Sequence, residues 1–162
     1  MEKFLAEEKI LDVEAGLDLN TAAFAGKRIA MKDAHRLAIV IALSGGAAAN
    51  IALTLLQHNA KTLGVSKELK IKNNVYYKLE TETSFSVLEA SVEAPLTEAD
   101  LSAKFNGAKG LIVIEVLPED LDVDNSFGYV SVNAEDSAVA TPATVMYVGV
   151  SKYLPAYVKS MI

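Results

Sequence analysis

Residues 37–56 read LAIVIALSGGAAANIALTLL, a run of 20 residues without a charged side chain. A run of this length is long enough to span a lipid bilayer as a helix. Its centre opposes that interpretation, because Ser44-Gly45-Gly46 is typical of a turn and Asn50 would be costly to place in lipid. The apolar residues on either side are rich in Ile, Val, Leu and Thr, as strands are. We therefore predict two strands, Arg36–Leu43 and Ile51–Asn59, joined by a loop of small residues, and no membrane association.

The rest of the chain contains short runs of strand type separated by turn residues. Val75–Leu79 has an alternating pattern, and Leu111–Leu117 is almost wholly apolar, which favours a strand buried on both faces. Asn73-Asn74 lies between Leu69–Lys72 and Val75–Leu79, and asparagine tolerates the backbone of a two-residue hairpin turn. Roughly nine or ten short strands with frequent turns predict an all-β fold, either a β-sandwich or a jelly-roll-like barrel.

One short segment has the features of a helix. Thr97-Glu98-Ala99-Asp100 is similar to a capping box, and Pro95 favours a break in the chain just before it. We expect a short helix near residues 97–105. The simplest partition is one β-sandwich domain over residues 17–162, with residues 1–16 as an N-terminal arm or an edge segment.

The composition excludes several classes of function. The 162-residue chain has no cysteine, which removes thiol catalysis, disulfides, iron–sulfur clusters and cysteine-ligated zinc. Its net charge is −6, and residues 1–81 hold 11 Lys/Arg and 9 Asp/Glu, whereas residues 82–162 hold 4 Lys/Arg and 12 Asp/Glu. An acidic half repels phosphate backbones, so we expect no nucleic-acid partner. The acidic half is either a solvated face or a surface that docks on a basic partner.

Aspartates occupy every second position in the densest acidic run of the chain. Asp120, Asp122 and Asp124 match positions one, three and five of a calcium loop. Position six is Asn125 rather than glycine, and position twelve is Ser131 rather than glutamate, so the sharp turn and the bidentate ligand are missing. We expect a solvated turn here, with calcium binding and a partner-docking patch as the alternatives.

The chain offers few residues for catalysis. Its two histidines, His35 and His58, lie at the start of one predicted strand and at the end of another, and no nucleophile-elbow motif accompanies them. Ser44–Ala49 and Gly107–Gly110 lack the lysine and the hydroxyl of a phosphate-binding loop. We therefore predict structural roles for both histidines, and no catalytic residue, cofactor or metal site.

Several segments are together similar to a known group of proteins. They are LDLNT at residues 17–21, MKDAHRLAIVI at 31–41, LTLLQH at 53–58, IEV at 114–116 and LDVDNSFGYVSV at 121–132. In this order, and followed by a terminal strand that contains tyrosine, they resemble small virion structural proteins encoded in the head and tail gene region of tailed bacteriophages. The resemblance covers about residues 17–158 and rests on strand and turn residues, not on a catalytic motif. The chain departs from the group at Ala47-Ala48-Ala49, where members have a more polar loop rich in Gly, Thr and Asp.

The resemblance implies a non-enzymatic viral structural protein. We expect a capsid decoration (cement) protein, which binds the outer surface of the phage head and stabilises it. Such a protein is made in the bacterial cytoplasm, resides in the virion, contacts the major capsid protein and forms a homo-oligomer, a trimer or a dimer. Two alternatives remain: a tail or head–tail connector protein, and a binding module or hydrolase on a β-sandwich. A buried carboxylate pair or a cleft lined by aromatic side chains would favour the second of these.

Overall fold

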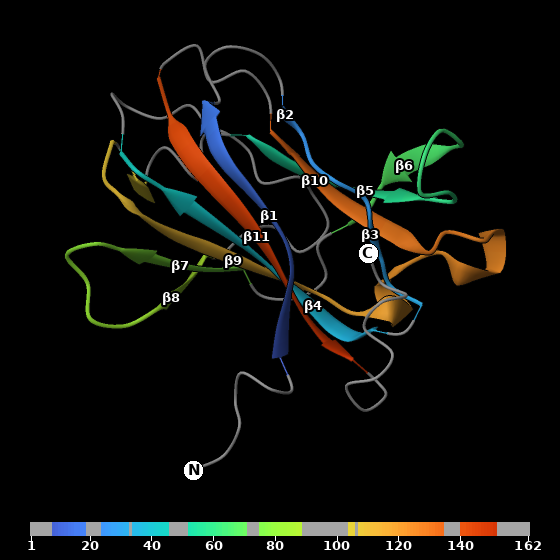
Figure 1. Ribbon diagram of the computed structural model, residues 1–162. Helices are drawn as coiled ribbons and strands as arrows, with labels where there is room; N and C mark the ends of the chain where they lie inside the picture. Colours follow the sequence, from blue (N-terminus) through green and yellow to red (C-terminus); the bar gives the residue numbers. More distant parts are fainter. Residues whose placement is uncertain are drawn as a thin grey trace.

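The described part of the chain is built from strands and tight turns. Figure 1 shows a computed structural model, which describes residues 8–18, 24–32, 34–45, 52–70, 75–88, 104–105, 107–134 and 140–151. Within these residues the strands are β1 (Glu8–Asp18), β2 (Phe24–Ala25), β3 (Ile29–Ala30), β4 (Ala34–Leu43), β5 (Leu53–His58), β6 (Ser66–Glu68), β7 (Val75–Leu79), β8 (Ser86–Leu88), β9 (Gly110–Val116), β10 (Tyr129–Ala134) and β11 (Pro142–Ser151). Two 3-10 helices, η1 (Pro118–Asp120) and η2 (Val123–Asn125), lie between β9 and β10.

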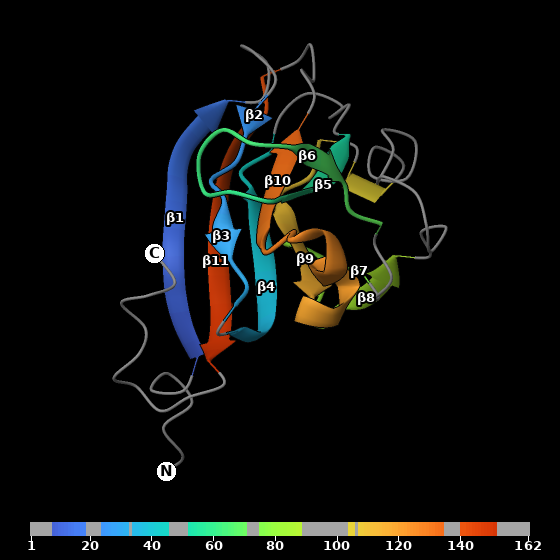
Figure 2. The same cartoon turned by 90° about the vertical axis from the view of Figure 1, so that its right-hand side faces the viewer.

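The strands form two antiparallel sheets that pack face to face in a single domain (Figure 1). The order in the larger sheet is β1-β11-β4-β9-β7-β8. The order in the smaller sheet is β2-β10-β5-β6, and β3 also pairs with β10. Figure 2 shows the smaller sheet in front of the larger one. The predicted β-sandwich is therefore confirmed, and the described strands form two separate sheets rather than one closed barrel.

The period of two along β4 explains where the core lies. Leu37, Ile39 and Ile41 are at most 1% exposed, whereas Val40 and Ala42 are only half-buried. Successive side chains of a strand point to opposite faces of its sheet, so the first set faces the smaller sheet and the second faces outwards. The neighbouring strands follow the same alternation. Their fully buried side chains include Ile112, Ile114, Val130, Val132, Val145 and Tyr147.

The strand pair predicted around the uncharged run is confirmed. β4 covers the first predicted strand, β5 covers most of the second, and the two lie in different sheets. The described residues include no helix with the length and hydrophobicity that a membrane crossing requires. The strand predicted at Leu111–Leu117 is also present as β9, but its outward residues Leu111 and Val113 are half-buried rather than buried.

The turn predicted at Asn73-Asn74 lies outside the described residues, as do Ile71 and Lys72 of the strand predicted before it. β6 pairs with β5 in the smaller sheet, whereas β7 pairs with β8 and β9 in the larger sheet. β6 and β7 thus lie in different layers, and the buried side chain of Leu69, just after β6, belongs to the core. An alternating pattern identifies the buried face of a strand, but it does not identify the partner strand.

Two other predicted segments are described only in part. Residues 97–103 of the predicted short helix lie outside the described residues, and Lys104 and Phe105 have a helical backbone. Of the segment 1–16, residues 8–16 belong to β1, an edge strand that pairs with β11. Register shifts interrupt this pairing twice, and Gly16 has a φ of 70° at the second shift. Positive φ favours glycine, and such irregularities are typical of β-bulges.

Candidate functional site

His58 is the centre of a chain of hydrogen bonds between β5, β6 and β10. The side chain is 3% exposed. Its Nδ1 lies 2.7 Å from Ser66 Oγ, and its Nε2 lies 2.8 Å from Ser131 Oγ. The sheet register brings these groups together, because His58 pairs directly with Ser66 on β6, and β10 runs along the other side of β5. Each imidazole nitrogen therefore has a hydroxyl partner, as buried polar groups require.

Arg28 and Asn133, at the two ends of this series of hydrogen bonds, determine which atom donates in each of them. Arg28 Nη2 donates to Ser66 Oγ at 3.3 Å, and Ser131 Oγ donates to Asn133 Oδ1 at 3.4 Å. Ser66 can then donate to Nδ1 of His58, and the Nε2–H group of His58 donates to Ser131. We assign a neutral imidazole with its proton on Nε2 from this pattern. Burial lowers the pKa of His58, and the nearby Arg28 guanidinium lowers it further.

The Ser66–His58 pair has the distance of a nucleophile and its general base. In a catalytic triad, however, the second imidazole nitrogen faces a carboxylate that stabilises the imidazolium. Here that nitrogen faces the hydroxyl of Ser131, and the Arg28 guanidinium disfavours a second positive charge. This arrangement is suited to holding three strands together and is poorly suited to removing a proton from Ser66.

Acidification is expected to destabilise the fold through His58. Because the folded-state pKa is lowered, the neutral imidazole stabilises the fold above the ordinary pKa of about 6.5. That contribution is lost as the pH falls from about 6.5 towards the folded-state pKa, with a slope of at most about 1.4 kcal/mol per pH unit. His58→Gln cannot titrate, so its free energy of unfolding should fall less between pH 7.5 and 5.5 in urea titrations.

The matched control is His35→Gln. His35 is exposed on β4. This variant keeps His58 and its hydrogen bonds, so it should keep the loss of stability that His58 causes at low pH. If His58→Gln retained the full pH dependence of the wild type, the assignment of the acid sensitivity to His58 would be wrong.

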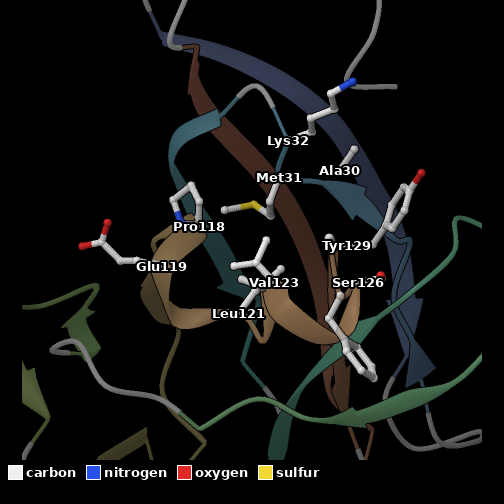
Figure 3. A pocket seen from close by; sticks show the side chains of 11 residues that line it. Ala30, Met31, Lys32, Pro118, Glu119, Leu121, Val123, Ser126 and Tyr129 are labelled. Atoms are coloured by element: carbon white, nitrogen blue, oxygen red, sulfur yellow. The ribbon is translucent and has the colours of Figure 1, made fainter.

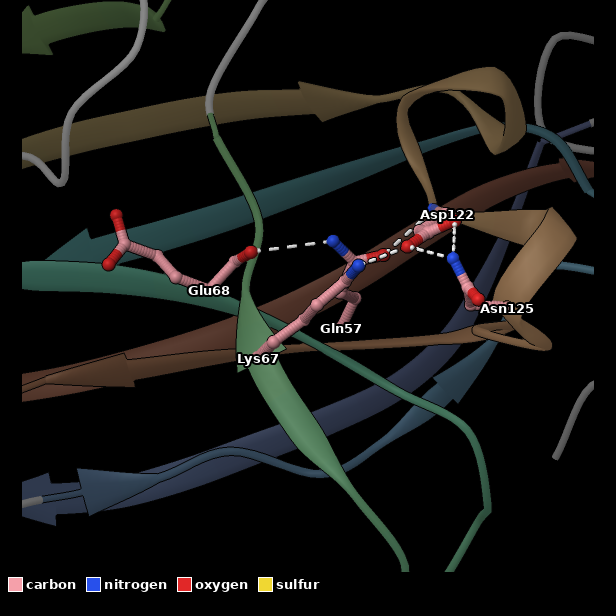
Figure 4. A network of polar contacts seen from close by, with 5 residues as sticks. All are labelled: Gln57, Lys67, Glu68, Asp122 and Asn125. Carbon is pink, nitrogen blue, oxygen red and sulfur yellow. Dashed lines mark hydrogen bonds and ion pairs between the residues drawn. The ribbon is translucent and has the colours of Figure 1, made fainter.

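Asp122 is held in a network of polar contacts around the end of η1 (Figure 4). Asn125 Nδ2 donates to both carboxylate oxygens of Asp122, at 2.8 and 2.9 Å, and Lys67 Nζ contacts Oδ2. The Asp122 N–H donates to Gln57 Oε1 at 2.8 Å, and Gln57 Nε2 donates to the carbonyl oxygen of Glu68 at 3.3 Å. The hydrogen bonds from Lys67 and then Asn125 lower the pKa of the Asp122 carboxyl. The network ties the connection between β9 and β10 to the edge of the smaller sheet.

The three alternating aspartates do not converge on one point. Asp120 Oδ2 accepts a hydrogen bond from the Leu117 N–H at 2.8 Å, which closes the first turn of η1. Asp124 is exposed on η2. Among the residues that the structure describes, no group of three or more His, Cys, Asp or Glu side chains is placed to hold a metal ion. Asp120 and Asp122 thus stabilise a loop, and the pairing of Asp122 with Gln57 and Lys67 carried no local signal in the sequence.

A cavity of about 620 Å³ lies between the end of β3, the two 3-10 helices and the start of β10. Met31, Leu121 and Phe127 are buried residues of its lining, whereas Val123 is 64% exposed. Figure 3 shows the Lys32 and Glu119 side chains extending away from the apolar group. The volume and the apolar lining are those of a small-molecule or side-chain binding pocket.

The described lining of the cavity offers few groups for catalysis. Among its described residues Glu119 is the single carboxylate, so these residues provide no carboxylate pair for glycoside cleavage. His58 and Ser66 are not among the lining residues. The aromatic side chains of Phe127 and Tyr129 do line it, which is the feature that a binding module would have.

The two glycine-containing loops behave as turns where they are described. Gly45 has a φ of 91° and Gly107 a φ of 82°. These conformations favour glycine for steric reasons, so neither glycine needs a phosphate to explain it. Residues 46–50 of the first loop lie outside the described residues.

Comparison with known proteins adds no relative to this picture. No family of known sequences, no curated protein and no solved structure matches the chain. The function has to be inferred from the residues and the geometry of this chain.

Proposed function

We propose that the protein is a non-enzymatic virion structural protein of a tailed phage, which decorates the outer surface of the capsid. The observation that carries the proposal is that the polar candidate residues stabilise the fold, whereas apolar side chains are exposed at the surface. His58 and Asp122, the strongest candidates for chemistry, make hydrogen bonds that hold strands and loops together. Large apolar side chains are instead left at the surface: Val13, Phe85 and Val87 are 42%, 49% and 49% exposed. Val13 and Val87 lie at the opposite edges of the larger sheet, so apolar side chains are exposed at both ends of this sheet, and exposed apolar surface is typical of proteins that bind other proteins.

The sandwich suits a protein that acts by contact. Its core is filled by interdigitating aliphatic side chains from both sheets, which makes a stiff body. On a capsid many copies can each bind weakly while the array holds firmly. The resemblance to small virion proteins supports the same role, and the acidic half of the sequence suits a basic docking surface.

The test is binding to empty heads of the phage that encodes the chain. We expect the purified protein to cosediment with undecorated heads and to form a regular array on them in electron micrographs. Heads that already carry a full complement should bind no more. Labelling confined to the tail or the connector would favour the alternative virion locations, and absence of the protein from purified particles would contradict a virion role.

The cavity favours a second candidate, a binding module for an apolar ligand. Gly128 lines this cavity, and a Cβ added there would meet no atom within 4 Å. A bulky substitution, Gly128→Leu, should therefore occupy space without a clash. If apolar compounds raise the melting temperature of the wild type and leave that of Gly128→Leu unchanged, the cavity is a ligand site. Equal responses of the two proteins would count against this candidate.

A further inference from the structure

An unbroken apolar row crosses the larger sheet from edge to edge. Each member pairs directly with the next across neighbouring strands, and directly paired residues share a face of the sheet. The members of this cross-sheet row are, in order, Val13, Met146, Val40, Val113, Tyr76 and Val87.

The cross-sheet row lies on the outer face of the larger sheet. The residues next to its members, such as Ile39, Ile114 and Tyr147, are buried in the core between the sheets. The row therefore points the other way, since side chains alternate between the two faces. Figure 2 shows the smaller sheet on the core side of the larger one. Val13 and Val87, at the two ends of the row, are 42% and 49% exposed.

Charged side chains flank the row on opposite sides. Lys78 lies two residues beyond Tyr76 on β7, next to Leu111 on β9. Glu115 lies two residues beyond Val113 on β9, in the opposite direction, next to Ala38 on β4. Glu115 also lies 3.8 Å from Arg36 Nη1 within the same chain. The face thus has Lys78 on one side of an apolar strip, and Glu115 with its partner Arg36 on the other.

We infer that a second copy of the chain packs on this face, about a two-fold axis that runs along the cross-sheet row. Such an axis places the cross-sheet row of one copy over the same row of the other copy. It also places the side that carries Lys78 in one copy over the side that carries Glu115 in the other. Lys78 of one copy then lies close to Glu115 of the other, one strand away, and the same contact occurs twice. An isologous interface needs this kind of self-complementarity. Two sheets stacked face to face are about 10 Å apart, as in a sandwich.

The size of the face is that of a small specific dimer. Counting the row and one outward residue on each side of it, the four longer strands offer three residues each, β7 offers two and β8 offers one. At about 4.8 Å by 6.8 Å per residue these cover roughly 500 Å² in each copy, and the total of about 1,000 Å² matches the roughly 1,000 Å² expected of a specific interface. The composition also fits, because apolar residues fill the centre and charges lie at the rim.

The first experiment places a charge in the middle of the row. Wild-type protein is expected to be a dimer by sedimentation equilibrium, and Val40→Glu should raise the dissociation constant about a hundredfold or more, since it buries an unpaired charge in each copy. Val65→Glu is the matched control, because Val65 is 59% exposed outside the larger sheet, and it should dimerise like the wild type. Circular dichroism and thermal melts establish that each variant is folded. Because Val40 lies at the centre of the sheet, Val13→Glu at its exposed edge is the variant to use if Val40→Glu does not fold.

The second experiment tests the direction of the axis. Lys78→Glu or Glu115→Lys alone should raise the dissociation constant about tenfold, because each brings like charges together. The double variant Lys78→Glu/Glu115→Lys should return it to within about threefold of the wild-type value, since the pairs are restored with reversed sign. No recovery in the double variant would overturn the proposed axis.

Two results would overturn the dimer itself. One is a wild-type protein that stays monomeric at millimolar concentration. The other is a Val40→Glu variant that is folded and dimerises like the wild type. Neither result bears on the binding of heads, which is measured separately, so this inference and the capsid proposal can fail independently.

Discussion

Replacement of Tyr147 by alanine is expected to lower the free energy of unfolding by about 3–5 kcal/mol. Tyr147 lies on β11, is fully buried and is the largest completely buried side chain among the described residues. Its hydroxyl donates a hydrogen bond to Glu14 Oε2 on β1 at 2.9 Å. Burial, together with the nearby Glu14 carboxylate, raises the pKa of Tyr147, so the hydroxyl stays protonated and remains a donor. The alanine variant loses the packing of the ring and leaves a cavity between the sheets.

Tyr147→Phe is the control that separates the ring from the hydroxyl. It keeps the aromatic packing and removes one hydrogen bond, which should cost about 1 kcal/mol. Guanidinium chloride titrations of the three proteins give the comparison. A loss below about 1.5 kcal/mol in Tyr147→Ala would mean that the ring is not packed in the core, because deletion of a buried aromatic ring costs more.

The second large effect is expected at Gly26, where the chain passes between β2 and β3. The Gly26 N–H donates to the carbonyl oxygen of Val132 at 2.9 Å. A methyl group at this position would overlap that same oxygen and the hydroxyl of Tyr147. Since one of these atoms belongs to the backbone of β10, Gly26→Ala should lower the free energy of unfolding by about 2–3 kcal/mol.

Gly128→Ala is the matched control for Gly26→Ala. A Cβ at Gly128 meets no atom within 4 Å, so this variant should stay within about 0.5 kcal/mol of the wild type. In the double variant Gly26→Ala/Tyr147→Phe one of the two overlapping atoms is gone, and the two losses should sum to more than the observed effect. Additive losses would show that the Tyr147 hydroxyl does not limit the space at Gly26.

The sequence predicts the elements of this fold better than their partners. The alternation of Leu37, Ile39 and Ile41 with smaller residues identified β4 and its buried face, since both follow from the local period of two. Nothing local in the sequence indicates that β6 belongs to the smaller sheet whereas β7 belongs to the larger one. Which strand lies beside which depends on how the whole core is filled.

The candidate site also depends on contacts between residues that lie far apart in the sequence. The sequence places His58 near the end of a strand, but it does not indicate the two hydroxyl groups that its imidazole contacts. Its partner Ser131 is 73 residues away, and Asp122 meets Gln57 across 65 residues. Such contacts depend on the register of β5 with β6 and β10, which no spacing along the chain encodes.

The two interruptions in the pairing of β1 with β11 have a consequence for crowded conditions. β1 is an edge strand, and an uninterrupted edge would offer further copies a template for endless strand addition. Bulges bend such a strand, so its free N–H and C=O groups do not match the hydrogen-bonding register of another strand that approaches it. Copies concentrated side by side should therefore meet through their faces, as discrete particles, and should not grow into fibres.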